Sequence, residues 1–205
     1  MTASPGSPGY PVASGPRPGE SSGPGSRTVP APSLPALPDH VRLIVTDVAY
    51  RDDVGCAAAV VADRWDAQFP SEVHAALRTP VAPYVPGNFR ERELPCLLAV
   101  LEGLSPEVVV VDGYAWLDAD GRKGLGAWLH DAIGAPVVGV AKTAFRGSPH
   151  ARAVLRGTST SPLYVTAVGL DLDLAEAGVR AMHGPHRLPT LVTLADRVAR
   201  AGESR

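Results

Sequence analysis

Residues 41–50 read VRLIVTDVAY, and this run decides the fold. Its apolar, β-branched side chains suit a buried strand. A turn at residues 51–55 leads to a second apolar run at residues 56–62, so the two are expected to form a β-hairpin. Asp47 interrupts the first run with a carboxylate, which is costly to bury without a partner. The domain therefore begins with a strand that carries a candidate functional side chain.

A strand, a helix and a strand follow in the second half of the chain. Residues 108–113 read VVVVDG, residues 125–133 have helical character, and residues 136–141 read PVVGVA. This order predicts a parallel βαβ unit. Together with the hairpin and a third strand at 72–79, it predicts an α/β fold with a mixed β-sheet flanked by helices.

Further segments complete the expected domain. Leucines at helical spacing predict a helix that ends near residues 103–105. We also expect a strand at 163–168, a helix at 174–182 with Asp173 as its N-cap, and a last helix near 191–201.

The composition indicates which parts of the chain fold and which classes of protein are excluded. Residues 1–38 are dominated by Pro, Gly and Ser and are expected to be a disordered tail before a single domain at 39–205. No apolar run approaches the length of a membrane span, and no secretory signal is visible, so we expect a cytoplasmic protein. We also expect it to be a monomer. Cys56 and Cys96 lie in apolar stretches, which favours buried, reduced thiols.

Asp47 and Asp112 are the first candidates for chemistry. Each belongs to an apolar strand, and the carboxyl ends of strands in α/β sheets face the ligand crevice. Two such carboxylates suggest a divalent-metal site, and Mg²⁺ completes its shell with water and phosphate. That preference suits phosphodiester cleavage. Taken singly, each Asp is also a common turn residue, so this alternative stays open.

The net charge of −2 conceals a basic segment. Residues 132–170 contain no Asp or Glu but include Lys142, Arg146, Arg152 and Arg156. The segment could contact phosphates, although a solvated surface explains the charges equally well.

Several blocks of the sequence resemble the endonuclease V family. The blocks that carry the resemblance are, in order, Thr46–Tyr50, Pro83–Gly87, Arg92–Pro95, Val110–Gly113, Gly139–Lys142, Pro162–Val165, Arg187–Pro189 and Leu194–Asp196. They are similar to the family's opening strand, its PYIPG-type loop, the RE-x-P helix start, the VDG and GVAK segments and its C-terminal elements. The resemblance extends from about Val41 to Ala199, and ordered blocks are far more specific than a lone motif.

The resemblance implies a ribonuclease H-like fold and a metal-dependent nuclease. Asp47, Glu93 and Asp112 would gather to hold Mg²⁺, with Mn²⁺ as a substitute, and Asp196 matches a family position near the metal. Lys142 would stabilise the charge that develops on the phosphate.

The resemblance also implies a nucleic-acid-binding set. The loop residues Tyr84, Val85, Pro86 and Gly87 would wedge between bases, and Gly113 would let a base approach the backbone closely. Arg146 is added from the basic segment as a phosphate contact.

The segment after Asp112 departs from the family pattern. The family continues with a small polar residue or His, then Gly, whereas residues 114–123 here read YAWLDADGRK. We therefore expect a changed pocket wall and an altered base preference. Trp65, Trp116 and Trp128 are interpreted as packing residues, and His183 and His186 as loop residues.

The combined interpretation is an endonuclease that cleaves 3′ to a deaminated purine, inosine, in DNA, with RNA or single-stranded nucleic acid as alternatives. Two other functions stay open: a noncatalytic nucleic-acid-binding module, and a structure-specific nuclease on the same fold.

Overall fold

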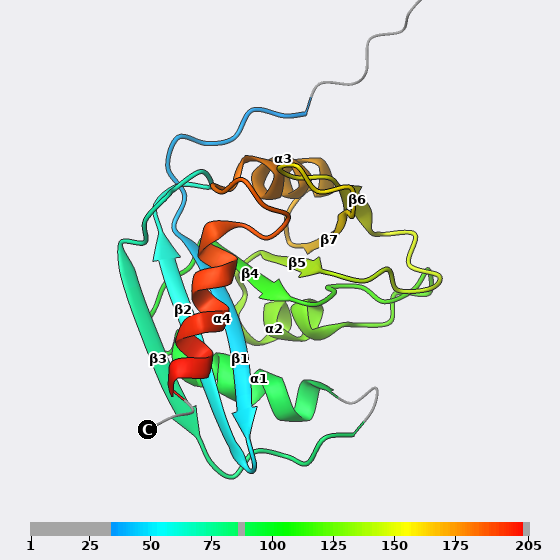
Figure 1. Cartoon of the computed structure of the whole chain (residues 1–205). Helices are drawn as coiled ribbons and strands as arrows, with labels where there is room; N and C mark the ends of the chain where they lie inside the picture. Colours follow the sequence, from blue (N-terminus) through cyan, green and yellow to red (C-terminus); the bar gives the residue numbers. More distant parts are fainter. Residues whose placement is uncertain (1–33, 86–88, 203–205) are drawn as a thin grey trace, which may run out of the picture. The chain divides into compact units, whose positions relative to one another are not determined.

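The computed structural model describes residues 34–85 and 89–202 (Figure 1). Within them, seven strands form one sheet of order β3-β2-β1-β4-β5-β7-β6. The strands are β1 Leu43–Arg51, β2 Val54–Ala62, β3 Glu72–Arg78, β4 Val108–Asp112, β5 Val137–Ala141, β6 Arg152–Val154 and β7 Leu163–Val168. The helices are α1 Phe89–Leu101, α2 Leu125–Ile133, α3 Leu172–Ala181 and α4 Thr190–Gly202.

The sheet is mixed, as the sequence predicted. Strands β1, β4 and β5 run parallel to one another, while β1–β2, β2–β3, β5–β7 and β6–β7 are antiparallel pairs. The expected hairpin is β1–β2, and the expected βαβ unit is β4–α2–β5. The predicted ribonuclease H-like, helix-flanked sheet is thereby confirmed.

Two apolar layers cover the two faces of the sheet. Leu43 and Val45 of β1 pack in one layer with residues of α3 and α4, whereas Ile44 packs in the other layer with residues of α1 and α2. Figure 1 shows α4 across β1 and β2, with α1 behind them. Because successive strand residues point to opposite faces, the central strands are apolar on both sides.

Two expectations about local structure need correction. Helix α3 begins two residues earlier than predicted, because the cap is Asp171 and not Asp173: its side chain accepts hydrogen bonds from the backbone N–H groups of Asp173 and Leu174. The short edge strand β6 was not predicted, since three residues are too few to show an alternation of apolar and polar side chains.

Both cysteines are buried thiols that are not joined in a disulfide, as expected. Cys96 of α1 lies in the layer with α2, while Cys56 of β2 packs beneath Gly202 of α4 on the other face. None of the described helices is long and apolar enough to cross a membrane. The proposed tail lies almost wholly outside the described residues, although Leu37 packs against the core.

Candidate active site

Asp47 and Asp112 face one space because of the register of β1 and β4. The two strands pair in parallel up to Val45 and Val110, and each Asp lies two residues further along its strand. The two carboxylates therefore project from the same face. The strand pairing ends here, where the Thr46 hydroxyl donates a 3.1 Å hydrogen bond to the Val110 carbonyl oxygen.

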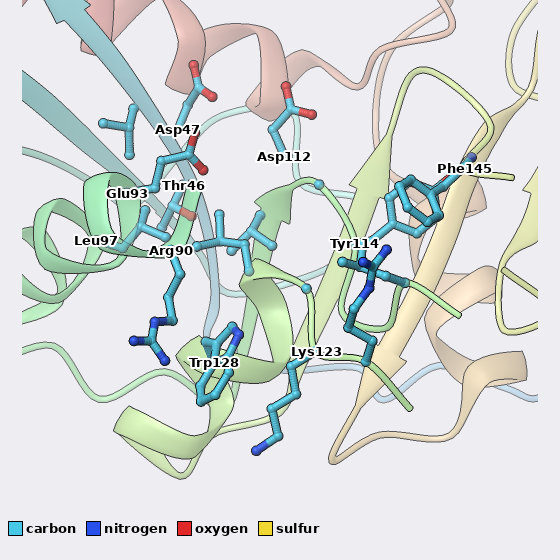
Figure 2. A pocket seen from close by; sticks show the side chains of 17 residues that line it. Thr46, Asp47, Arg90, Glu93, Leu97, Asp112, Tyr114, Lys123, Trp128 and Phe145 are labelled. Atoms are coloured by element: carbon cyan, nitrogen blue, oxygen red, sulfur yellow. The ribbon is translucent and has the colours of Figure 1, made fainter. Parts of the chain in front are cut away.

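Glu93 reaches the same space from helix α1. Arg90, Glu93 and Leu97 lie on one helical face, and all three line a cavity of about 740 Å³ together with Asp47 and Asp112. Leu97 is buried and fixes this face of the helix against the core. Figure 2 shows the three carboxylates at one end of the cavity.

Asp47 and Glu93 are held in a poorly solvated, negatively charged environment. Burial, followed by the charges of Asp112 and Asp196, raises the pKa of Asp47 to about 6. Burial, followed by the charges of Asp112 and Asp47, raises the pKa of Glu93 to about 7. Groups that repel one another in this way favour a cation between them.

Lys142 supplies a positive charge at the edge of this cluster. It follows β5 directly, and its Nζ donates a 2.6 Å hydrogen bond to Asp112 Oδ2. Burial alone would lower the pKa of Lys142, but the hydrogen bond to Asp112 and the charges of Asp47 and Asp196 raise it overall. The ammonium is therefore charged near neutral pH.

Asp196 lies on α4 and takes part through its charge. Its carboxylate accepts a 2.9 Å hydrogen bond from Arg200, and it acts on both Asp47 and Lys142 electrostatically. It is not among the residues that line the cavity with Asp47, Glu93 and Asp112.

Arg187 is a supporting residue to which the sequence assigned no role. Its guanidinium donates hydrogen bonds to the backbone carbonyl oxygens of Lys142 and Pro162, and the shorter of the two contacts with Pro162 measures 2.6 Å. Lys142, directly after β5, is thereby fixed to Pro162, directly before β7. The sequence signal was the RLP segment, but nothing in it indicates which backbone it holds.

Gly113 and Gly139 let backbones come close beside the carboxylates. Gly113 has φ of +135°, a conformation that other residues rarely adopt. A Cβ on Gly139 would lie 2.6 Å from the Gly113 carbonyl oxygen and 2.7 Å from Thr166 Oγ1. That hydroxyl accepts a 2.8 Å hydrogen bond from the backbone N–H of Ala115. Strands β4 and β5 and the segment after Asp112 are thus packed directly on one another.

The divergent segment forms the rest of the cavity wall. The Tyr114 hydroxyl donates to the Thr143 carbonyl oxygen at 2.9 Å and accepts from the backbone N–H of Phe145 at 3.0 Å, which ties this segment to the loop after β5. Trp128 was interpreted as a packing residue, yet it also lines the cavity. Trp65 is indeed buried in the core.

The donor set suits a hard divalent cation. Among residues 34–85 and 89–202, no three His, Cys, Asp or Glu side chains already converge closely enough to enclose a metal ion. Mg²⁺ binds through as few as one or two carboxylates and keeps several waters, so a loose set of three carboxylates fits its chemistry. The mutual repulsion of Asp47 and Glu93 is consistent with this fit.

Other residues singled out from the sequence lie elsewhere. Tyr84 and Val85 are exposed, at 61% and 48%, and are not part of the cavity lining, while Pro86 and Gly87 lie outside the described residues. Arg146 is exposed on the loop after β5.

Two arginines of the basic segment are committed to the protein itself. Arg156 is 5% exposed and donates to the carbonyl oxygens of Met182, His186 and Arg187. Arg152 pairs with Asp173 and Glu176. The idea that the whole segment contacts phosphates was therefore wrong for Arg156, because a buried guanidinium cannot reach a strand of nucleic acid.

Comparisons with known proteins identify the family of the chain. The family model for endonuclease V matches residues 33–169. A protein of Streptomyces coelicolor named endonuclease V is 36% identical, over 80% of each chain. The crystal structure of endonuclease V from Streptomyces avermitilis is 32% identical, covers 82% of this chain and 84% of its own, and has a TM-score of 0.68. A Ciona intestinalis endonuclease V, solved with DNA containing an inosine, is 18% identical, with 81% and 87% coverage and a TM-score of 0.67, and shares the fold. The chain belongs to the endonuclease V family.

Proposed function

We propose that this protein is a metal-dependent endonuclease that hydrolyses a phosphodiester bond on the 3′ side of inosine in DNA. The observation that supports this most is the meeting of Asp47, Glu93 and Asp112 at one cavity, beside Lys142. Family membership makes an inosine-containing strand the first substrate to test. RNA is the second substrate to test. That the protein is cytoplasmic and monomeric stays a prediction.

Each site residue has a role in this proposal. Asp47, Glu93 and Asp112 would hold Mg²⁺ or Mn²⁺, and Asp196 would add negative charge from α4. When bound, such an ion supplies a Lewis acid and an activated water. Lys142 orients Asp112 through its hydrogen bond and presents a positive charge to a phosphate oxygen.

In this proposal the cavity binds the extruded base. The loop before α1 separates neighbouring bases. Leu97, Val111 and Leu125 give the cavity an apolar lining that excludes water from an extruded base. Gly113 leaves the backbone open to close approach. Tyr84 and Val85 are exposed ahead of α1, where they can contact neighbouring bases, with Pro86 and Gly87 completing the proposed wedge and Arg146 reaching a phosphate.

The test is a nicking assay on the full chain. A labelled duplex with one inosine is incubated with protein and Mg²⁺, next to the same duplex with adenine and to the Asp112→Ala variant. We expect a single nick in the inosine strand that EDTA abolishes. Cleavage no greater than that of Asp112→Ala would contradict the proposal, and binding without any nick would favour a noncatalytic relative.

A further inference from the structure

We propose that Arg90 and Lys123, held against Trp128, bind a backbone phosphate of the nucleic-acid strand at the end of the cavity away from the carboxylates. We call these three residues the cationic rim. The inference rests on the proposed function and adds a second anchoring point for the strand. One of the three residues, Lys123, lies in the segment 114–123 that departs from the family pattern.

The rim is built by contacts between two cations and one indole. The Arg90 guanidinium lies 4.4 Å from the ring centroid of Trp128, and Lys123 Nζ lies 4.9 Å from it. The three residues come from α1, from the segment after β4 and from α2, and all line the cavity. Cation–aromatic contacts of this kind fix the direction of long, flexible side chains.

The charge of the rim is only partly compensated. Lys123 pairs with Asp131, and that carboxylate is not among the residues that line the cavity. In the part of the chain that the structure describes, no carboxylate lies within ion-pair distance of Arg90. A guanidinium held on an aromatic ring without a carboxylate partner is suited to an external anion.

The arrangement favours a phosphate over a stacked base. Figure 2 shows Arg90 and Lys123 on either side of Trp128. Both cations lie against the indole ring, where a base would otherwise stack. The same view places the rim at the opposite end of the cavity from Asp47, Glu93 and Asp112. In this proposal, a strand cleaved at the carboxylates extends along the cavity and places another of its phosphates at the rim.

The experiment combines variants of the rim with neutral linkages in the substrate. Arg90→Gln and Lys123→Gln are assayed on an inosine strand in which one phosphate at a time is a methylphosphonate. Each variant should raise KM about tenfold with little change in kcat, and lower the salt slope of binding by about one. When the methylphosphonate replaces the phosphate that the rim contacts, the variant and the parent should have the same KM.

Controls separate the rim from general charge and from folding. Arg64→Gln removes an arginine that pairs with Asp66 away from the cavity, and it should leave KM unchanged. Trp128→Leu should raise KM, whereas Trp128→Phe, which keeps an aromatic face, should restore most of the affinity. Thermal unfolding of each variant shows that the fold is retained.

Two results would overturn the proposal. One is an Arg90→Gln protein with unaltered KM and salt slope. The other is a change in KM of the variants that depends on whether the strand carries inosine or xanthine and does not depend on the neutral linkage. That result would mean that the two cations recognise the base and not a phosphate. Binding is also measured with the Asp112→Asn protein, so the rim can be tested even if the wild type cleaves nothing and the proposed nuclease function fails.

Discussion

Asp47 and Asp112 occupy equivalent positions on adjacent parallel strands, each two residues beyond the last pair of the β1–β4 ladder. This register forces two like charges to share one face of the sheet at the edge of a cavity. Glu93 adds a third from α1. The fold thus keeps an unfavourable electrostatic arrangement that a bound cation would relieve.

The first prediction concerns stability and pH. The folded-state pKa of Asp47 is raised from 3.8 to about 6 and that of Glu93 from 4.5 to about 7. The folded protein therefore binds these protons more tightly than the unfolded chain does. Their stabilisation is complete below about pH 4 and is lost as the pH rises through 6 and 7. We expect the metal-free protein to lose on the order of 4 kcal/mol of unfolding free energy between pH 5 and pH 8.

Denaturant unfolding in EDTA across this pH range measures the effect. Glu93→Gln removes one of the titrating groups, so it should flatten the profile and stabilise the metal-free protein at pH 8. Adding Mg²⁺ at pH 8 should stabilise the parent more than the variant. An identical pH profile for both proteins would show that Glu93 does not carry the repulsion.

A second prediction concerns Arg187, which holds the backbone at Lys142. Arg187→Ala should lower kcat by about tenfold to a hundredfold, because Lys142 would no longer be fixed beside Asp112. Arg187→Lys keeps the charge but cannot donate to both carbonyl oxygens as a planar group, so it should rescue little. Equal activity of the lysine variant and the parent would instead indicate that only charge matters.

Gly139 gives a third prediction. A methyl group there would lie under 3 Å from backbone atoms of Gly113 and Ala115, so β4 and β5 would have to move apart. Gly139→Ala should reduce cleavage at least tenfold and lower the melting temperature, although it removes no functional group. Gly103→Ser is the matched control: nothing lies within 4 Å of its added Cβ, so it should affect only stability, through its positive φ. Full activity in Gly139→Ala would refute the close packing described above.

Arg156 gives a fourth prediction, on stability alone. It donates to three backbone carbonyl oxygens in the segment between α3 and α4, and burial lowers its pKa. Arg156→Met should cost about 2–4 kcal/mol, because buried acceptors would lose their donors. Chemical unfolding measures this, with the exposed Arg180→Met as the control. A loss below that of Arg180→Met would contradict the structural role.

The fold could be predicted from the sequence where apolar patterns are long. Long apolar runs typical of buried strands form β1, β2, β7 and the strands of the β4–α2–β5 unit. Two details could not be predicted in this way. Strand β6 has three residues, and residue type does not decide between Asp171 and Asp173 as the cap of α3, since both are suitable caps.

Site residues could be predicted from the sequence where a residue type is energetically unfavourable among its sequence neighbours. Asp47 and Asp112 stand out because carboxylates are rare in buried strands. Glu93 was identified only by resemblance to the family, because a glutamate on a helix is ordinary. The supporting contacts of Arg187 and the pairing of Arg90 with Trp128 depend on tertiary structure, since each joins residues more than twenty positions apart.

The placement of the two thiols on opposite faces of β2 has a practical consequence. Cys56 packs under α4 and Cys96 under α1, so the sheet itself separates their sulfur atoms. Air oxidation cannot cross-link them within one native molecule, because the bond would have to pass through a layer of backbone. Handling without reductant should therefore leave the folded chain without an internal disulfide, and any such bond that forms would report local opening of the α1 or α4 layer.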